Sequence, residues 1–129
     1  MSDPRSRLHD YLDHILVAIE RIERYTEEVD EVAFLQNELI QDAVIRNLEI
    51  VGEASNNIEK GFPNFVVANP EIPLSFAYQM RNVVAHGYFK VDLEVVWKTI
   101  QTDIPVFYAQ IDAAKETKRG QVFTFAYRA

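Results

Sequence analysis

The chain contains no cysteine, which excludes a disulfide framework, a thiol nucleophile and a zinc site of the cysteine type. A long hydrophobic run is also missing: the most apolar stretch, residues 15–19, falls far short of the roughly 20 residues that span a membrane. No basic segment followed by an apolar one opens the sequence, so no secretory signal is expected. These absences predict a protein of the cytoplasm, without a membrane segment, whose fold is held by packing alone.

Motifs that usually bind phosphate, carry a catalytic nucleophile or bind a metal are absent as well. The sequence has only four glycines and contains no glycine-rich phosphate loop, no Gly-x-Ser-x-Gly and no His-Glu-x-x-His. We therefore expect no cofactor and no metal.

Positive charge is scarce. Residues 1–60 carry 6 Lys and Arg against 14 Asp and Glu, a net charge of −8, whereas residues 61–129 carry 7 against 6, a net charge of +1. General affinity for nucleic acid comes mainly from basic side chains that displace counterions, and no basic stripe is present. Tight, indiscriminate binding of nucleic acid is not expected.

The composition and the apolar pattern of the sequence are typical of a single helical domain. The 129 residues are 48% hydrophobic and 26% charged, which is ordinary for a soluble domain. A seam of apolar residues predicts a first helix that opens near Pro4 and frays before Asp30; it consists of Leu8, Leu12, Ile15, Ile19 and Ile22. Asp30 is the expected cap of a second helix that runs to about Lys60 and is ended by Gly61.

The second half continues the pattern. Three prolines between Gly61 and Pro73 predict an ordered loop, and a short third helix follows from Leu74 to about Ala85, ended by Gly87. A fourth helix is expected after the cap Asp92, with a bend at Pro105 because the apolar period continues past it. The prediction is an all-α, antiparallel bundle of four to five helices over residues 1–115.

Residues 116–129 form a tail of different character. Val122, Phe123, Phe125 and Tyr127 give it a strand-like alternation, but one strand alone is not stable. The sequence leaves open whether this tail lies on the bundle or docks elsewhere.

Two polar clusters favour a structural interpretation. His9, Asp10, Asp13 and His14 lie one helical turn apart, but they flank the apolar seam of the first helix, so we expect a solvated face rather than a metal site. Arg46, Glu49 and Glu53 have the spacing of a surface ion-pair row. Because their neighbours are apolar, one of the three could instead be buried and pair with another helix.

The segment 81–88, RNVVAHGY, concentrates groups that suit phosphate chemistry. Arg81 is a permanent cation whose guanidinium fork binds phosphate, and Asn82 is its polar neighbour. Histidine in general titrates near neutrality and moves protons, which is the chemistry that His86 offers, and Tyr88 adds a phenol. A plainer interpretation also fits, in which His86 interacts with the helix dipole and Arg81 forms a surface ion pair.

Geometry complicates a catalytic role, because positions five apart on a continuous helix are separated by roughly 140° and 7.5 Å. Unwinding at residues 85–87 would bring the two side chains together, and so would a two-fold dimer that supplies a second copy. Cleavage of RNA by its own 2′-hydroxyl needs both a base and an acid. One chain offers one suitable histidine, whereas a symmetric dimer offers two.

The motif resembles that of the HEPN superfamily, in which Arg is followed four to six residues later by His, and it is most similar to the HepT type, Arg-x4-His-x-Tyr. Arg81, His86 and Tyr88 meet that pattern, with Asn82 as the polar residue often found after the Arg. Residues 41–54 and 92–97 are also similar to the family. The resemblance covers about residues 5–115 and leaves the tail unmatched.

The resemblance implies a homodimeric helical bundle and a metal-independent endoribonuclease, the toxin of a toxin–antitoxin pair, that cleaves RNA by 2′-hydroxyl attack. Arg81 and His86 from two subunits would then be catalytic, Asn82 would support the site, and a nucleotidyltransferase antitoxin would silence it by adenylylating Tyr88. The acidic charge favours an exposed single-stranded loop or a tRNA end as substrate. The alternative is a non-catalytic HEPN dimer that binds nucleotide or a nucleotidyltransferase. Assembly beyond the dimer stays open.

Overall fold

The computed structural model describes the backbone of residues 4–86 and 91–128, and the side chains of residues 6–80 and 91–116. Within these ranges the protein is all-α, as predicted, and has six helices. They are α1 (Pro4–Tyr25), α2 (Glu31–Leu35), α3 (Glu38–Gly61), α4 (Pro63–Ala68), α5 (Leu74–His86) and α6 (Leu93–Arg128). The count exceeds the expected four to five because two short helices, α2 and α4, were not predicted.

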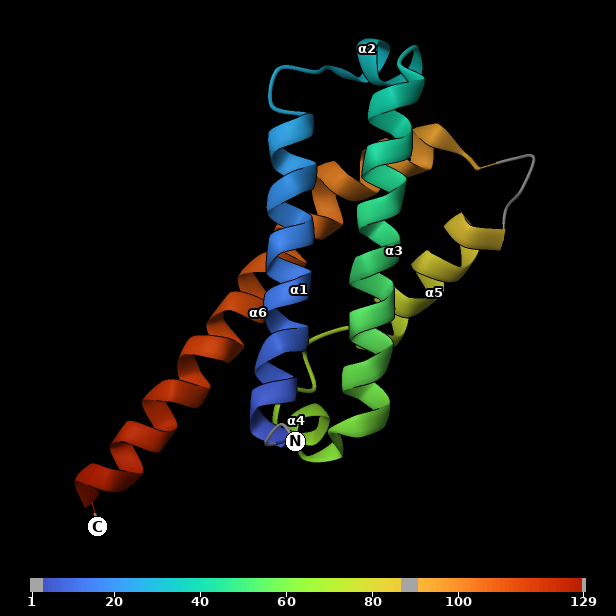
Figure 1. The fold of residues 1–129 in the computed structure, drawn as a ribbon. Helices are drawn as coiled ribbons and strands as arrows, with labels where there is room; N and C mark the ends of the chain where they lie inside the picture. The colour runs from blue at the N-terminus through green and yellow to red at the C-terminus, as the bar shows by residue number, and fades with distance from the viewer. Residues whose placement is uncertain (1–3, 87–90, 129) are drawn as a thin grey trace.

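Helix α3 is the central element of the fold. It packs against α1 on one side and α5 on another, and α6 packs against α1 and α2 (Figure 1). Helices α1 and α3 run in opposite directions, and so do α3 and α5 (Figure 1). The antiparallel arrangement predicted from the sequence is therefore present in these pairs.

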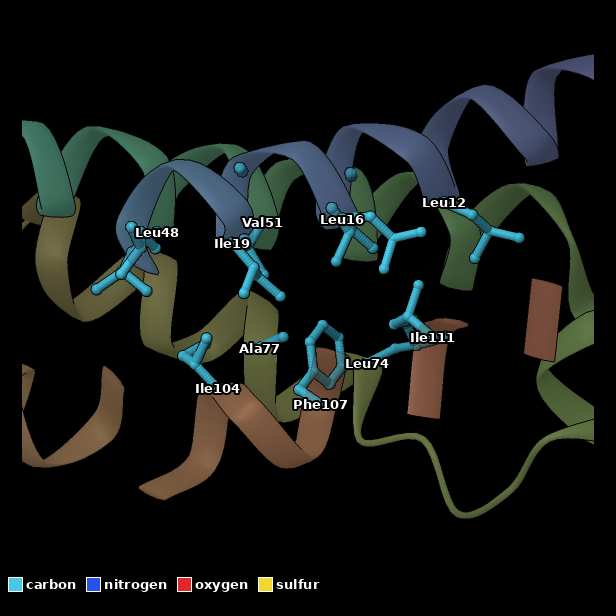
Figure 2. Close-up of a cluster of buried hydrophobic side chains, with 14 of the residues drawn as sticks. Leu12, Leu16, Ile19, Leu48, Val51, Leu74, Ala77, Ile104, Phe107 and Ile111 are labelled. Carbon is cyan, nitrogen blue, oxygen red and sulfur yellow. The ribbon is translucent and has the colours of Figure 1, made fainter. Parts of the chain in front are cut away.

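The predicted seam of α1 forms the centre of the core. Leu8, Leu12, Ile15, Ile19 and Ile22 are all buried, with 0–2% of their surface exposed. Figure 2 shows α1 side chains meeting residues of α3, α5 and α6, among them Leu48, Val51, Ala77, Ile104 and Phe107. The heptad-like spacing of the sequence thus identified the face of α1 that is removed from water.

The expected single helix from Asp30 to Lys60 is wrong, because the chain turns between α2 and α3. Asp30 does cap α2, accepting a hydrogen bond of 2.9 Å from the Ala33 amide. Asn37 then caps α3, accepting one of 3.0 Å from the Ile40 amide. The turn allows Phe34 to be fully buried, with its ring 5.3 Å from that of Trp97 on α6.

Two further expectations need correction. The proline-rich connection between Gly61 and Pro73 contains α4, which begins at Pro63 and buries Phe65. The tail is not strand-like, since the backbone of α6 stays helical to Arg128 and extends away from the other helices (Figure 1). The chain continues as helix there because the last turns of α6 already supply the hydrogen-bonding template.

Other boundaries agree with the prediction. Helix α5 begins at Leu74 and includes His86. Asp92 caps α6, its Oδ1 atom accepting hydrogen bonds from the amides of Glu94 and Val95. Pro105 lies inside α6 without breaking it, and Figure 1 shows the helix changing direction along its length. No helix among the described residues is long and apolar enough to cross a membrane.

Candidate functional site

The Arg-x4-His motif lies on the second half of α5. The backbone of positions 81, 82 and 86 is helical, whereas the side chains of Arg81, Asn82 and His86 are not among those that the structure describes. Tyr88 and Gly87 lie outside the described residues. Because the helix includes His86, unwinding at residues 85 and 86 does not bring the motif together.

Helical register assigns the two catalytic candidates to different faces. Position 81 follows Leu74 by seven residues and Ala77 by four, so it continues their face, and both of these residues are buried. Position 86 follows Gln79 by seven residues, and Gln79 is exposed. Positions 81 and 86 of one copy of α5 therefore belong to different faces of the helix.

A side-chain contact fixes how α5 is aligned with α3. The Ser75 hydroxyl donates a hydrogen bond to the Glu59 carboxylate. Figure 1 shows α5 inclined to α3 and running in the opposite sense, so this contact joins the first turn of α5 to the last turn of α3.

The three residues predicted to form a surface ion-pair row lie beside a cavity. Arg46, Glu49 and Glu53 are among the residues that line a cavity of about 320 Å³ between α1 and α3. Arg46 and Glu53 are exposed and Glu49 is half-buried, so the expectation of a surface row holds for two of the three. Sequence reasoning missed two other lining residues, Tyr11 and Asn57, because only the packing of α1 on α3 brings them together.

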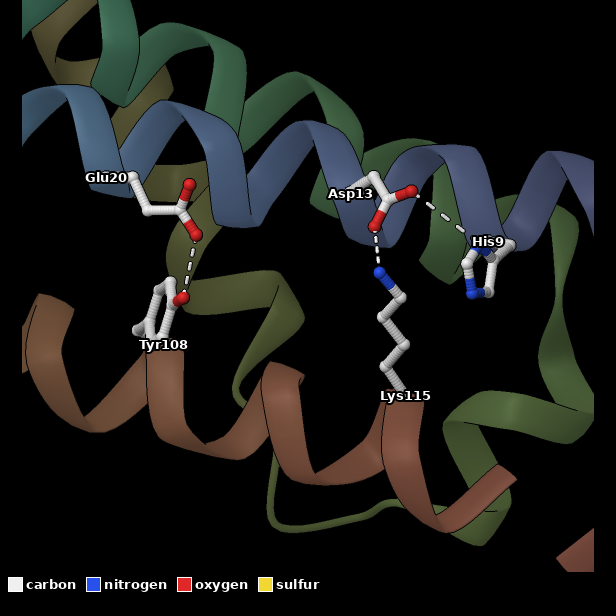
Figure 3. A network of polar contacts seen from close by, with 5 residues as sticks. All are labelled: His9, Asp13, Glu20, Tyr108 and Lys115. Carbon is white, nitrogen blue, oxygen red and sulfur yellow. Dashed lines mark hydrogen bonds and ion pairs between the residues drawn. The ribbon is translucent and has the colours of Figure 1, made fainter. Parts of the chain in front are cut away.

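The histidine cluster of α1 is largely solvated, as expected. Asp10 and His14 are exposed, and His9 Nδ1 is 3.6 Å from Asp13 Oδ2 (Figure 3). Asp13 also forms an ion pair with Lys115 of α6, so this carboxylate joins two helices. Among the described residues, no group of three or more His, Asp or Glu side chains is arranged to hold a metal ion.

Tyr108 forms a second polar contact between α1 and α6. Its hydroxyl donates a hydrogen bond of 2.7 Å to Glu20 Oε2 (Figure 3). This hydrogen bond and the burial of the ring raise the pKa of Tyr108 to about 12. This hydrogen bond therefore joins the middle of α6 to α1.

An apolar surface lies beside the motif, on the face shared by α5 and α6. Phe76, Val95 and Val106 are 52–59% exposed. Phe76 and Met80 together line two adjoining cavities, of about 280 Å³ on the side of Val106 and about 380 Å³ on the side of Val95. No sequence signal marked this surface, because the exposure of an apolar residue depends on which helices cover it.

Comparisons with known proteins agree with the resemblance. A family model described as "Ribonuclease HepT-like" matches residues 15–114. A protein named "Probable ribonuclease HepT", from Thermococcus cleftensis, is 48% identical over 96 residues, which cover 74% of this chain and 84% of that protein. No solved structure matches significantly.

Two proteins of Methanocaldococcus jannaschii are also similar. A candidate RNase, MJ1380, is 33% identical over 110 residues, covering 85% of this chain and 94% of that protein. A second, MJ0434, carries a name that joins gamma-glutamylcyclotransferase with a candidate RNase; it is 36% identical over 121 residues, which are 91% of this chain but 53% of that protein.

Proposed function

We propose, from the premise that this chain belongs to the HepT-like ribonuclease family of the HEPN superfamily, that it is an endoribonuclease whose catalytic residues are Arg81 and His86. The observation that carries the proposal is the match of the family model to residues 15–114, a range that contains the whole motif on α5. We assign residues 1–115 to a single HEPN-like bundle and residues 116–129 to an appended tail.

The proposed reaction is a transesterification that needs no metal. A base removes the proton of a ribose 2′-hydroxyl, the oxygen attacks the adjacent phosphorus, and the bond to the 5′-oxygen of the next nucleotide breaks. The products are a 2′,3′-cyclic phosphate and a 5′-hydroxyl, the latter protonated by an acid. His86 supplies the proton transfers, Arg81 binds the phosphate and offsets its growing negative charge, and Asn82 supports the site.

The geometry of α5 favours a site built from two copies of the chain. Positions 81 and 86 of one helix are roughly 140° apart, so a single copy does not direct both at one phosphate. A two-fold dimer provides two guanidinium groups and two imidazoles around a shared groove. The dimer also supplies both a general base and a general acid, because each subunit contributes one His86.

The apolar surface of Phe76, Val95 and Val106 is the face through which we expect the copies to pair. It combines a protruding aromatic side chain with two hollows on either side of it, the self-complementary shape that a two-fold contact requires. It also lies on the half of the chain with a net charge of +1. Pairing there keeps the two strongly acidic halves apart.

Regulation by a partner follows from the position of Tyr88. Two residues after His86, this phenol suits modification by a nucleotidyltransferase antitoxin, which would add adenylate and make this chain the toxin of the pair. The added phosphates would bind Arg81 and repel RNA. The proposed substrate is an exposed RNA loop or a tRNA end. Because this RNA and the antitoxin would both be met in the cytoplasm, we assign the activity to that compartment.

A second candidate function is favoured by the net charge of −7. A dimer with twice this charge binds RNA weakly unless its groove is locally positive. The same fold would then serve as a non-catalytic HEPN module that binds nucleotide or a nucleotidyltransferase. Consumption of RNA separates this candidate from the ribonuclease.

The experiment is an RNA cleavage assay with purified protein in the presence of a chelator. We expect cyclic-phosphate ends from the native chain, and a loss of rate of about 100-fold or more in His86→Ala, since general acid–base catalysis contributes 10²–10⁴-fold. His9→Ala, which changes a histidine of α1, is the matched control and should retain full rate. Full activity in His86→Ala, or activity that disappears with the chelator, would overturn the proposal.

A further inference from the structure

The last turns of α6 differ in charge from the rest of the chain. Residues 1–116 contain 10 Lys and Arg against 20 Asp and Glu, a net charge of −10. Residues 117–129 contain three basic residues, Lys118, Arg119 and Arg128, and no Asp or Glu, a net charge of +3. The two values sum to the net charge of −7 of the whole chain. This short segment therefore has a charge opposite to that of the residues before it.

The backbone directs this segment away from the bundle. Ala114 is the last buried residue among the α6 side chains that the structure describes, and Lys115 forms an ion pair with Asp13 of α1. Beyond them α6 continues as a helix and extends away from the other helices (Figure 1). Residues 117–128, which we call the α6 arm, form about 18 Å of helix at 1.5 Å per residue. The arm also lies outside the range 15–114 that the family model matches.

The sequence of the α6 arm combines basic residues with aromatic ones. Lys118 and Arg119 are followed, over about two turns of helix, by Phe123, Phe125 and Tyr127. Basic side chains neutralise phosphates, and aromatic rings stack on any base because every base has a π-face. Proteins that bind single-stranded nucleic acid without sequence preference combine these two kinds of side chain.

We propose that the α6 arm binds single-stranded RNA and supplies affinity that the acidic bundle does not. Lys118, Arg119 and Arg128 bind phosphates, and the aromatic residues of the arm stack on bases. Binding of this kind does not depend on the base sequence, so the arm holds the RNA while the motif on α5 carries out the chemistry. This inference rests on the proposed ribonuclease function, because it assigns the arm to the substrate of that reaction.

The distance of the arm from the bundle supports this role. RNA that approaches residues 1–116 meets their net charge of −10, which repels its phosphates. Such repulsion is screened over a Debye length of about 8–10 Å at physiological salt. Residues 123–128 are roughly 12–20 Å along the helix from Lys115, so they meet RNA where the repulsion by the bundle is weak.

The test measures the binding of two short 2′-O-methyl RNAs, oligouridylate and oligoadenylate, at several salt concentrations. These RNAs are not cleaved, because the attacking hydroxyl is blocked. The first variant combines Lys118→Gln, Arg119→Gln and Arg128→Gln. For single strands the logarithm of the binding constant falls by about 0.7 per phosphate contact for each tenfold increase in salt, so the slope should become shallower by about 2. The affinity at 0.1 M salt should fall by roughly 10- to 100-fold, equally for both RNAs.

A second variant tests the stacking of bases on the arm. Phe123→Leu together with Tyr127→Leu keeps apolar side chains that suit a helix but removes two rings. We expect the affinity for both RNAs to fall by about fivefold or more, which is the smallest loss typical of removing a stacked ring. The salt dependence should stay native, because no phosphate contact is lost. A native affinity in this variant would contradict stacking and overturn the proposal.

The matched control combines Arg7→Gln, Arg21→Gln and Arg24→Gln. It removes the same three positive charges from exposed positions of α1. We expect a native salt slope and a much smaller loss of affinity, because these side chains lie on the bundle and not on the arm. Equal losses in the control and in the arm variant would indicate a general effect of net charge and overturn the proposal. Circular dichroism checks that every variant is folded.

Two further outcomes separate the arm from other roles. Binding to vesicles of anionic lipid that the arm variants lose, with RNA binding unchanged, would identify a membrane-surface helix and overturn the proposal. Cleavage of unmodified RNA separates the arm from the ribonuclease. If the native chain cleaves and the arm variants bind and cleave equally well, the arm is contradicted and the ribonuclease is not. If binding depends on the arm but the native chain does not cleave, the ribonuclease is contradicted instead.

Discussion

Tyr108 is the described residue whose titration the fold changes most clearly. The hydrogen bond that its hydroxyl donates to Glu20 stabilises the protonated form of Tyr108, and burial adds to this effect. The pKa of Tyr108 therefore rises from 10.0 to about 12. A raised pKa in the folded state means that the contact stabilises the protein fully below the unfolded value of about 10. That stability is lost as the pH rises through the folded value.

We therefore predict a loss of stability between about pH 10 and pH 12 that depends on this tyrosine. Urea unfolding at pH 8, 10 and 11 should show a steeper fall for the native chain than for Tyr108→Phe, which keeps the ring and lacks the titrating proton. Tyr25→Phe, which removes an exposed phenol at the end of α1, is the control and should follow the native chain. Equal slopes for native protein and Tyr108→Phe would show that the contact with Glu20 does not shift the equilibrium.

At the scale of elements, the break between α2 and α3 depends on the cap at Asn37. Its side-chain oxygen satisfies the Ile40 amide at the start of the central helix. We predict that Asn37→Ala destabilises the protein by about 1 kcal/mol, the typical cost of losing such a cap. Asn37→Asp keeps the acceptor and should unfold at nearly the native urea concentration. If both variants lose equal stability, the amide is not satisfied by this side chain.

The break between α2 and α3 shows which features of the fold the sequence predicts and which it does not. Apolar spacing located the buried seam of α1, and the caps Asp30 and Asp92 located two helix starts, because these signals act within a few residues. The break before Asn37 follows from the packing of Phe34 on Trp97, a contact between distant parts of the chain. Periodicity continues across such a break and does not show it.

The prediction of a strand-like tail was wrong, and the helix faces of the motif were not predicted, for related reasons. The alternating aromatics of residues 122–127 suggested a strand, but α6 had begun at Leu93 and its continuation costs less than a new, unpaired element. The motif around Arg81 and His86 was visible as a pattern of residue types at fixed spacing. The face on which each position lies required the packing of Leu74 and Ala77, and the cavity at Tyr11 required two helices side by side.

The charge of the whole molecule is uneven, and its described residues include an apolar face on α5 and α6; together these favour pairing of two copies in one particular way. The acidic residues are concentrated before residue 61, so two copies that meet through α1 or α3 would repel each other. The face of Phe76, Val95 and Val106 belongs to the nearly neutral half, and Phe76 is on α5, the helix that carries the motif. Under the proposed function, a contact there would create the groove shared by the two copies of the motif.

We predict that Phe76→Asp converts the protein from a dimer, twice 14.9 kDa, to a monomer and reduces cleavage of RNA at the same time. A charge at the centre of an apolar contact is not paired when the copies meet, so it opposes association strongly. Sedimentation equilibrium gives the mass, circular dichroism checks folding, and the cleavage assay gives activity. Val95→Asp serves as the second variant on the same face.

Leu39→Asp and Val67→Asp are the matched controls, because these side chains are 80% and 79% exposed and neither lines the two cavities beside Phe76. They introduce the same charge into exposed apolar positions, so a general effect of acidity on RNA binding would appear in all four variants. Loss of the dimer and of cleavage only in the α5 and α6 variants would assign both to one face. A folded Phe76→Asp chain that remains dimeric would locate the interface elsewhere, and a monomer with undiminished cleavage would show that one copy of Arg81 and His86 is enough.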